Sequence, residues 1–373
     1  MIFKKIFFPE DKAVIDNTQP WGPPATEQKS TRLAPIFTSH AVLQRDCPIT
    51  LFGTGSGNVT VEFLGNTYRG LTDKDGFTVT LPKTPAGGPY TLTVNIDGKI
   101  TLLEDILLGD VILLAGQSNA ELPMDQTDYP TEKYTSNDRV RAYFVGQHFS
   151  EEFHYKSILD NRWAKLDESE AAKWPAIAYH LGNRIEGEYN VPVGFVCVVK
   201  GASVIQSFMP LKAQDEFEFK PEELSVEHPC NSAFERHRCF NEKAVIYRTM
   251  FKTVVPYTVS SVIWYQGESN IGSGESKVYD KLLAAMIAEW RADLGDEALP
   301  FIIVKIHARN NNAGWLAVRE AQERAAKNIA WCYLIDLDPL GVITDIHPKN
   351  KDAVSELIYL GYYENIYGAS DKE

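Results

Sequence analysis

The chain has 373 residues, of which 44% are hydrophobic and 11% aromatic, and it carries a formal net charge of −13. This is the composition of a globular protein with a sizeable core, at a length that suits one large domain or two. The acidic balance disfavours nucleic acid as a partner, because phosphate binding needs a basic surface. No stretch reaches the roughly 18 apolar residues of a membrane-spanning helix, so no membrane partner is expected.

The five cysteines are scattered and odd in number, which disfavours a disulfide framework. His228, Cys230, His237 and Cys239 lie close together in the sequence, but their one-residue spacings are unlike those of zinc fingers. No metal is therefore expected, and the role of these four side chains stays open. The N-terminal MIFKKIFFPEDK has too short an apolar run for a secretion signal, so the sequence as it stands predicts a cytoplasmic protein. A secreted or periplasmic protein whose signal has been removed is the alternative.

Residues 1–32 are rich in proline and lack periodicity, and we expect them to form a lead-in segment. From residue 33 to 107, short alternating runs are separated by turn signals. These runs are ITLFG, VTVEFLG, FTVTLP, YTLTVNI and KITLLEDILL. Short strands at this spacing predict a small antiparallel β-sandwich, which would be an accessory domain.

From residue 108 to 373, near-continuous aliphatic runs alternate with helical stretches. The runs are VILLAG (111–116), VRAYFVG (140–146), VGFVCVV (193–199), SVIWY (261–265), FIIVKI (301–306) and AWCYLIDL (330–337). Hydrophobic strands that alternate with helices predict a parallel sheet covered on both faces, and hence a three-layer α/β/α domain. Residues from about 205 to 242 break the pattern and are expected to form an irregular insertion.

Polar residues follow four of the predicted strands. They are GQSN at 116–119, KGAS at 200–203, QGESN at 266–270 and TDIHP at 344–348. Because ligands bind outside the carboxyl ends of parallel strands, we expect these groups to meet at one edge of the sheet. A hydroxyl, an imidazole base and N–H donors for an oxyanion are the groups that acyl transfer needs. Ser118 does not lie in a G-x-S-x-G elbow, which disfavours the α/β-hydrolase version of this chemistry.

The motifs GQSN, WYQGESN and DIHPKNK resemble those of the sialate O-acetylesterase branch of the SGNH hydrolases. VLQRDCPITLFGTGSGNVTVEF and AGGPYTLTV resemble that family's N-terminal β-domain, so the resemblance covers about residues 33–366. It implies an SGNH-type catalytic domain and a serine esterase that hydrolyses O-acetyl esters of carbohydrates without a cofactor. O-acetylated sialic acid is the expected substrate, and acetylxylan or another acetylated glycan is the alternative. A catalytically weak carbohydrate-binding protein is the alternative of another class. The oligomeric state stays open.

The resemblance also implies roles for individual residues. Ser118 would be the nucleophile and His347 the general base. The oxyanion hole would consist of the backbone amides of Ser118 and Gly201, with a side-chain amide from Gln266 or Asn270.

Two further residues, Gln117 and Glu268, are expected to support the site, with Glu268 fixing its loop by hydrogen bonds rather than acting as an acid. The family usually has an aspartate three residues before the histidine, where this chain has Thr344. Asp345, two residues before His347, is therefore the provisional third member of a triad, and a Ser-His dyad is the alternative. KGASVIQSFM stands where relatives usually have two glycines followed by a tryptophan, which leaves the shape of the substrate pocket open.

Two other histidines have different expected positions. His307 follows the strand FIIVKI and is a candidate for its border, whereas His180 lies in a helical pattern and is expected to be a packed or surface residue.

Overall fold

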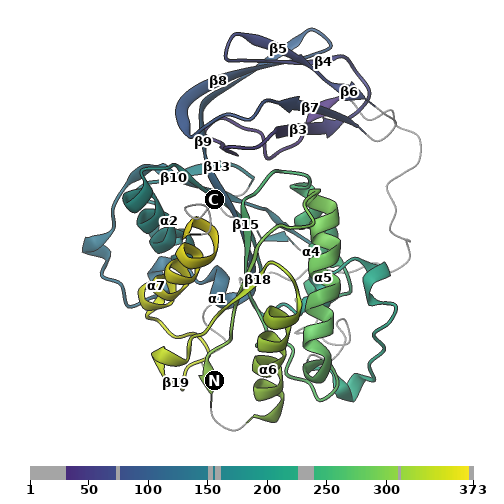
Figure 1. Ribbon diagram of the computed structural model, residues 1–373, viewed down its shortest axis with the longest axis vertical. Helices are drawn as coiled ribbons and strands as arrows, with labels where there is room; N and C mark the ends of the chain where they lie inside the picture. Colours follow the sequence, from purple (N-terminus) through teal and green to yellow (C-terminus); the bar gives the residue numbers. More distant parts are fainter. Residues whose placement is uncertain are drawn as a thin grey trace, which may run out of the picture.

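The computed structural model describes residues 31–72, 76–149, 154–155, 161–225, 239–309 and 312–368. Two parts are evident: β-sheets at the upper end of the molecule, and a larger α/β part below them (Figure 1). Among the described residues, no helix combines the length and the apolar character needed to cross a membrane.

The upper part consists of two groups of strands. One described sheet has the order β1-β3-β7-β6, formed by β1 (Arg32–Leu33), β3 (Ile49–Thr54), β7 (Phe77–Leu81) and β6 (Leu71–Thr72). The other group is β2 (Val42–Gln44), β4 (Val59–Phe63), β5 (Asn66–Arg69) and β8 (Gly87–Ile96), which join the first half of β9 (Lys99–Gly116). Leu51, Val61, Val79 and Val94 are fully buried in one core cluster, as the period-two pattern of these strands requires.

The strand β9 connects the two parts. Its first half pairs antiparallel with β8, from Lys99 to Leu108, whereas Asp110 to Gly116 pair in parallel with β14 (Val193–Val199). The predicted boundary between residues 107 and 108 therefore falls inside one continuous strand of 18 residues.

A cluster of charges braces this junction. Asp105 of β9 accepts hydrogen bonds from Arg141 Nη2 at 2.9 Å and His40 Nδ1 at 2.8 Å, and its carboxylate lies 2.7 Å from Lys165 Nζ. Burial acts to raise the pKa of Asp105, but these partners outweigh it and hold the pKa well below its usual range. Arg141 is itself buried, so the cluster ties β9 to the sheet below.

The lower part is built on a large sheet with the described order β13-β10-β14-β9-β15-β16-β18. Its further strands are β10 (Asn137–Phe144), β13 (Trp163–Leu166), β15 (Ser261–Tyr265), β16 (Phe301–Val304) and β18 (Cys332–Ile335). From β10 to β18 every pairing along this path is parallel, and β13 adds an antiparallel edge. Every residue of β14 and β15 is buried, as expected for strands covered on both faces.

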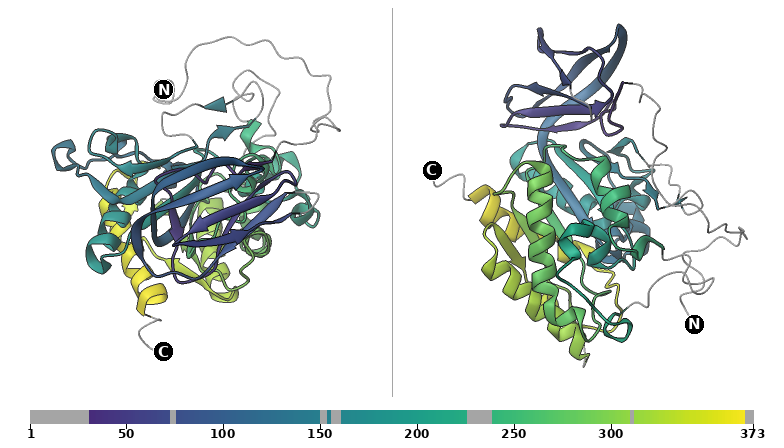
Figure 2. Two further views of the ribbon diagram at one scale, coloured as in Figure 1. Left: turned by 90° about the horizontal axis from the view of Figure 1, so that it is seen from above. Right: turned by 90° about the vertical axis from the view of Figure 1, so that its right-hand side faces the viewer.

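Helices cover both faces of this sheet (Figures 1 and 2). α2 (Ala176–Tyr189) and α7 (Lys351–Tyr362) pack on one face, and α4 (Val245–Thr249), α5 (Tyr279–Leu294) and α6 (Ala313–Asn328) on the other. Asn312 and Asn350 cap the amino ends of α6 and α7, and Gly295, in the left-handed conformation, ends α5. The prediction of an α/β fold with a large, mostly parallel sheet is confirmed.

The remaining described elements are short. The strands among them are β11 (Gln147–His148), β12 (His154–Tyr155), β17 (Ala308–Arg309) and β19 (Val342–Ile343). α1 (Ser118–Glu121) follows β9, and a π-helical turn at Tyr363–Tyr367 continues α7. In the stretch predicted as an irregular insertion, the described residues form the 3₁₀ turns Ile205–Phe208, Leu211–Gln214, Pro221–Glu223 and Cys239–Asn241.

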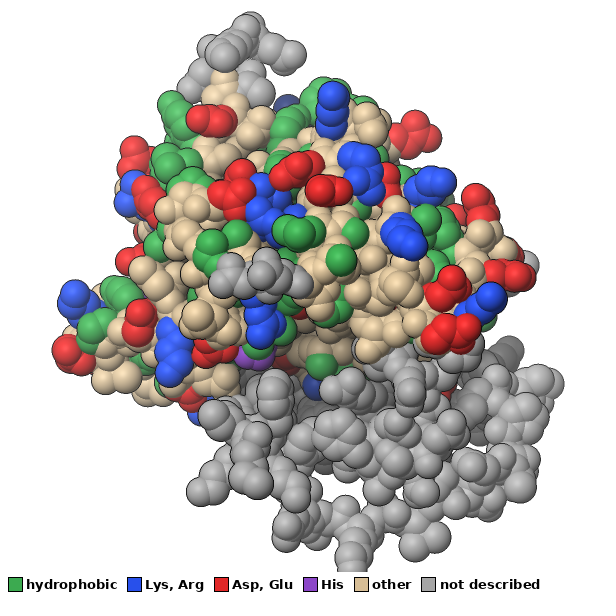
Figure 3. Space-filling model, turned by 90° about the horizontal axis from the view of Figure 1, so that it is seen from below, with side chains coloured by type: hydrophobic (Ala, Val, Ile, Leu, Met, Phe, Trp, Pro, Cys, Tyr) green, Lys and Arg blue, Asp and Glu red, His purple; other side chains and the backbone are tan. Residues whose placement is uncertain are grey.

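The strand order fixes the place where a ligand is expected. Along the path β13-β10-β14-β9-β15-β16-β18, β9 comes first in the chain but lies in the interior, between β14 and β15. Later strands are added on both sides of β9, and ligands of such sheets bind at the carboxyl end of the strands where the direction of addition changes. β9 runs downward in Figure 1 to α1, and Figure 3 views the molecule from that lower side. Acidic and basic side chains are interspersed over the described surface there, with a histidine visible among them.

Candidate active site

Ser118 lies where β9 turns into α1. Gly116 has φ of +141°, and a Cβ at this position would lie 2.1 Å from the carbonyl oxygen of Tyr265, so glycine is required there. The Gln117 N–H donates to that same carbonyl at 3.1 Å. Ser118 is then the first residue of α1, and among the described residues its N–H has no hydrogen-bond acceptor, as is usual for the first amide of a helix.

The structure brings His347 to this serine from 229 residues further along the chain. His347 lies in the loop between β19 and α7, and its Nε2 is 2.7 Å from Ser118 Oγ. Burial lowers the pKa of His347 and the positive charge of Lys351 lowers it further, while Asp345 opposes both. The imidazole is thus held neutral down to lower pH, in the form that accepts a proton.

Three aspartates that precede His347 in the sequence have different environments. Asp345 is exposed, and its Oδ1 accepts the backbone N–H of His347 at 3.0 Å. Lys305 Nζ lies 2.7 Å from Asp336 Oδ1 and 3.1 Å from Asp338 Oδ2. Among the described residues no acid is bonded to the imidazole Nδ1, so Asp345 contacts the histidine through its backbone only.

Gly201, which follows β14, lies beside the serine: a Cβ built on it would be 3.5 Å from Ser118 Cβ. Its N–H, however, donates to Glu121 Oε2 at 2.5 Å, and Gln147 Nε2 holds the other oxygen of that carboxylate at 2.7 Å. The Glu121 carboxylate therefore accepts a hydrogen bond from the Gly201 N–H, which was predicted to bind the oxyanion. Glu121 was not predictable as part of the site, because a lone glutamate in a short helix belongs to no catalytic motif.

The side-chain amides of Gln266 and Asn270 brace the site from within. Gln266 Nε2 lies 3.1 Å from Gln117 Oε1 and 2.8 Å from Asn270 Oδ1. Asn270 Nδ2 donates to Gln206 Oε1 at 2.8 Å and to Glu275 Oε2 at 2.9 Å. Both amides are fully buried, and their N–H groups donate to other protein groups.

The side chain of Gln117 is hydrogen-bonded to the backbone of the third motif, QGESN. Its Oε1 accepts the backbone N–H of Ser269 at 3.1 Å and that of Gly267 at 3.4 Å. Its Nε2 has no partner among the described residues. Gln117 therefore fixes the loop after β15 while one amide nitrogen stays unused.

Asn119 joins the three motifs in a buried polar group. Its Nδ2 donates to Glu268 Oε1 at 2.6 Å and to the carbonyl oxygen of Ile346 at 3.1 Å, and its Oδ1 accepts from Lys351 Nζ at 2.7 Å. Burial raises the pKa of Glu268 and lowers that of Lys351 to about 7. Glu268 is thus hydrogen-bonded to the side-chain amide of Asn119. Lys351 also belongs to this buried polar group, and the motif DIHPKNK, which contains it, did not predict this.

The remaining candidates lie outside this group. His307 is buried, neither of its ring nitrogens has a partner among the described residues, and burial lowers its pKa to about 4. His180 is packed in α2, with its ring edge-to-face on Tyr129 at 4.7 Å between centroids. His228, Cys230 and His237 lie outside the described residues, as does the side chain of Cys239.

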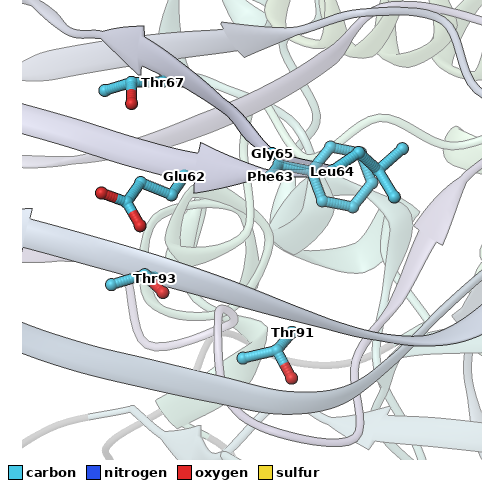
Figure 4. Close-up of a pocket in the computed structure, with 7 residues that line it drawn as sticks. All are labelled: Glu62, Phe63, Leu64, Gly65, Thr67, Thr91 and Thr93. Atoms are coloured by element: carbon cyan, nitrogen blue, oxygen red, sulfur yellow. The ribbon is translucent and has the colours of Figure 1, made fainter.

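A separate hollow lies on the upper sheets (Figure 4). It has a volume of about 390 Å³ and is lined by Glu62, Phe63, Leu64, Gly65, Thr67, Thr91 and Thr93. These residues come from β4, β5 and β8 and the turn between β4 and β5, so none of the predicted catalytic residues contributes to it.

Comparison with known proteins places the chain in a family. The model of a carbohydrate esterase family, sialic acid-specific acetylesterase, matches residues 108–355. The sialate O-acetylesterase of Homo sapiens is 23% identical over 386 residues (90% of this chain, 71% of the relative), and that of Mus musculus is 24% identical over 404 residues (90% and 74%). A crystal structure of a carbohydrate acetylesterase from Xanthomonas citri superposes with a TM-score of 0.76 at 28% identity, over 90% of this chain and 75% of that one. Because the matched range covers more than half of the chain and contains all three motifs, the chain belongs to the carbohydrate esterase family of sialic acid-specific acetylesterases.

Proposed function

We propose that the protein removes O-acetyl groups from carbohydrates through an acetyl-enzyme on Ser118, with O-acetylated sialic acid as its substrate. Membership of the family makes the chain a carboxylic ester hydrolase of acetylated carbohydrates. The observation that carries the serine mechanism is the 2.7 Å contact between Ser118 Oγ and His347 Nε2 at the carboxyl edge of the sheet.

The reaction proceeds in two steps. His347 takes the proton of the Ser118 hydroxyl while the oxygen attacks the acetyl carbonyl carbon, and the tetrahedral intermediate then expels the sugar alkoxide, which receives that proton from His347. Water next attacks the acetyl-serine with His347 again as base, and acetate leaves as Ser118 regains its proton. These side chains supply every proton transfer, so the reaction calls for no cofactor.

The oxyanion is stabilised by the N–H groups of Ser118 and Gly201. The N–H of Ser118 is unused among the described residues, which supports the first assignment. Gly201 serves only when the Glu121 carboxylate gives up its N–H, and so substrate binding must displace Glu121. Gln266 and Asn270 hold the surrounding loops in their present arrangement, and either would have to break internal bonds to act on substrate. Each oxyanion donor is worth about 3–4 kcal/mol of transition-state stabilisation.

Asp345 is proposed as a positioning residue that acts through the backbone of His347. Its carboxylate fixes the main chain at the histidine and adds negative charge that favours the imidazolium formed during attack. The catalytic unit is then a Ser118–His347 dyad assisted by Asp345.

Acetylxylan or another acetylated glycan is the alternative substrate, in keeping with the carbohydrate acetylesterase similarity. The upper strands, from residue 33 to about 107, are proposed to be an accessory β-domain. A protein that only binds carbohydrate is the remaining alternative, and the contact between Ser118 and His347 argues against it.

The test compares hydrolysis of p-nitrophenyl acetate and p-nitrophenyl octanoate by the wild type and by Ser118→Ala. We expect the wild type to prefer acetate and the variant to lose turnover by about 10⁴-fold or more. A variant as active as the wild type would rule out the serine mechanism. Mass-spectrometric deacetylation of 9-O-acetyl sialic acid and of acetylated xylo-oligosaccharides then decides the substrate, and preference for the latter would replace the sialate assignment.

A further inference from the structure

We propose that Lys351 is a positioning residue of the esterase reaction, which locks Asn119 between the serine and histidine motifs and whose positive charge keeps His347 in its basic, neutral form. This inference rests on the proposed function, since it assigns a role within the same site.

The geometry places Lys351 behind the catalytic pair. Lys351 is the first residue of α7 and only 1% exposed, and its Nζ donates to Asn119 Oδ1 at 2.7 Å. Asn119 follows Ser118 directly, and its Nδ2 donates to the carbonyl oxygen of Ile346, the residue before His347. One amide group therefore links the main chain on both sides of the Ser118–His347 contact, and Lys351 fixes which way that amide points.

The burial of this ammonium group is hard to explain as packing alone. Removing an ammonium from water carries a penalty of several kcal/mol, which a buried apolar side chain would avoid. Among the described residues, Lys351 has the Asn119 oxygen as its hydrogen-bond acceptor, with the Tyr265 ring 5.7 Å away. Glu268 is the buried carboxylate that attracts it, yet Glu268 Oε1 is bonded to Asn119 and Oε2 has no described partner. Ionisable groups kept at such a penalty are concentrated at functional sites.

The charges around Lys351 and His347 set the direction of the effect. Burial lowers the pKa of Lys351 to about 7, while Glu268 and Asp345 act to raise it. His347 faces Ser118, Lys351 and Asp345; burial lowers the pKa of His347, Lys351 lowers it further and Asp345 raises it. His307, after β16, is also influenced by the Lys351 charge.

The consequence concerns the acid side of the pH profile. Lys351 carries most of its charge below neutral pH, which is where a histidine base would otherwise become protonated and inactive. The ammonium group opposes that protonation by like-charge repulsion. It therefore extends hydrolysis toward lower pH.

The experiment measures kcat/KM for p-nitrophenyl acetate as a function of pH in the full chain. Lys351→Met removes the charge and the hydrogen bond, Lys351→Gln removes the charge but keeps a donor, and Lys351→Arg keeps the charge. Lys349→Met is the matched control, because Lys349 is an exposed lysine in the loop just before α7 and the substrate is uncharged. Circular dichroism and thermal melting establish which variants are folded.

We expect the acid limb to move to higher pH in Lys351→Met and Lys351→Gln, so that the ratio of activity at about pH 6 to that at about pH 8 falls several-fold. Lys351→Arg should keep the wild-type limb with a lower kcat, and Lys349→Met should match the wild type. An unshifted limb in Lys351→Gln overturns the proposal, and that variant serves if Lys351→Met does not fold. If the limb is unshifted but Ser118→Ala is inactive, only the role of Lys351 is refuted and the proposed function stands. If Ser118→Ala is active, the proposed serine mechanism itself is refuted.

Discussion

The role of Asp345 can be decided by the size of the effect when it is replaced. Its Oδ1 accepts the backbone N–H of His347 at 3.0 Å from an exposed position. A hydrogen bond to a charged group contributes about 1.5–3 kcal/mol, and exposure puts this one at the lower end. Because about 1.4 kcal/mol corresponds to a factor of ten, Asp345→Ala should lower kcat/KM by about tenfold. An acid that orients the imidazole through Nδ1 would instead cost about 10⁴-fold.

The assay is p-nitrophenyl acetate hydrolysis by Asp345→Ala and Asp345→Asn across the pH range. Asp345→Asn keeps an acceptor for the His347 amide, so its loss should be smaller than that of Asp345→Ala. Asp345 raises the pKa of His347, so removing its charge should move the acid limb to lower pH in both variants. A loss of about 10³-fold or more in Asp345→Asn would refute the backbone role and restore a full triad.

Three further predictions concern the oxyanion hole, a turn and the junction. Glu121→Ala frees the Gly201 N–H from a competing hydrogen bond to a charged group, so kcat/KM for p-nitrophenyl acetate should rise by about tenfold. A fall in kcat/KM would mean that Glu121 positions the turn and that another group binds the oxyanion. Ala202 has φ of +60°, where glycine is preferred, so Ala202→Gly should raise the free energy of unfolding by about 1 kcal/mol in urea denaturation, and a destabilised variant would contradict this. Asp105→Asn leaves buried Arg141 without its carboxylate and should lower the free energy of unfolding by about 2–3 kcal/mol at neutral pH. Since the pKa of Asp105 is depressed in the fold, its stabilisation is present above the unfolded value of about 3.9 and is lost as pH falls below it, so wild type and variant should converge in acid; a constant difference would exclude the charge as the cause.

Much of the fold was predictable from the sequence because burial on both faces leaves a clear pattern. Aliphatic runs such as VGFVCVV and SVIWY had to be covered strands, and both are completely buried. The continuity of β9 was not predictable in the same way. KITLLEDILL alternates like a half-buried strand and VILLAG is uniformly apolar, so the change of period suggested a boundary, whereas the structure has one strand whose surroundings change along its length.

The candidate site was likewise predictable only in part. That Ser118 and His347 meet was predictable, because each lies in a motif that follows a strand and the sheet brings such ends together. Glu121 and Lys351 were missed because a glutamate in a short helix and a lysine at the start of another are ordinary surface residues by pattern. The roles proposed for them depend on partners such as Gly201 and Asn119, which are close only in the folded chain.

The most direct test of the central claim is the detection of the acetyl-enzyme. The wild type is mixed with excess p-nitrophenyl acetate, quenched in acid within the first turnovers and digested, and the peptides are analysed by mass spectrometry. We predict one added acetyl group on Ser118 in the wild type and none in Ser118→Ala. Acetyl groups on a different residue, or hydrolysis in which Ser118 is never modified and is dispensable, would contradict the mechanism.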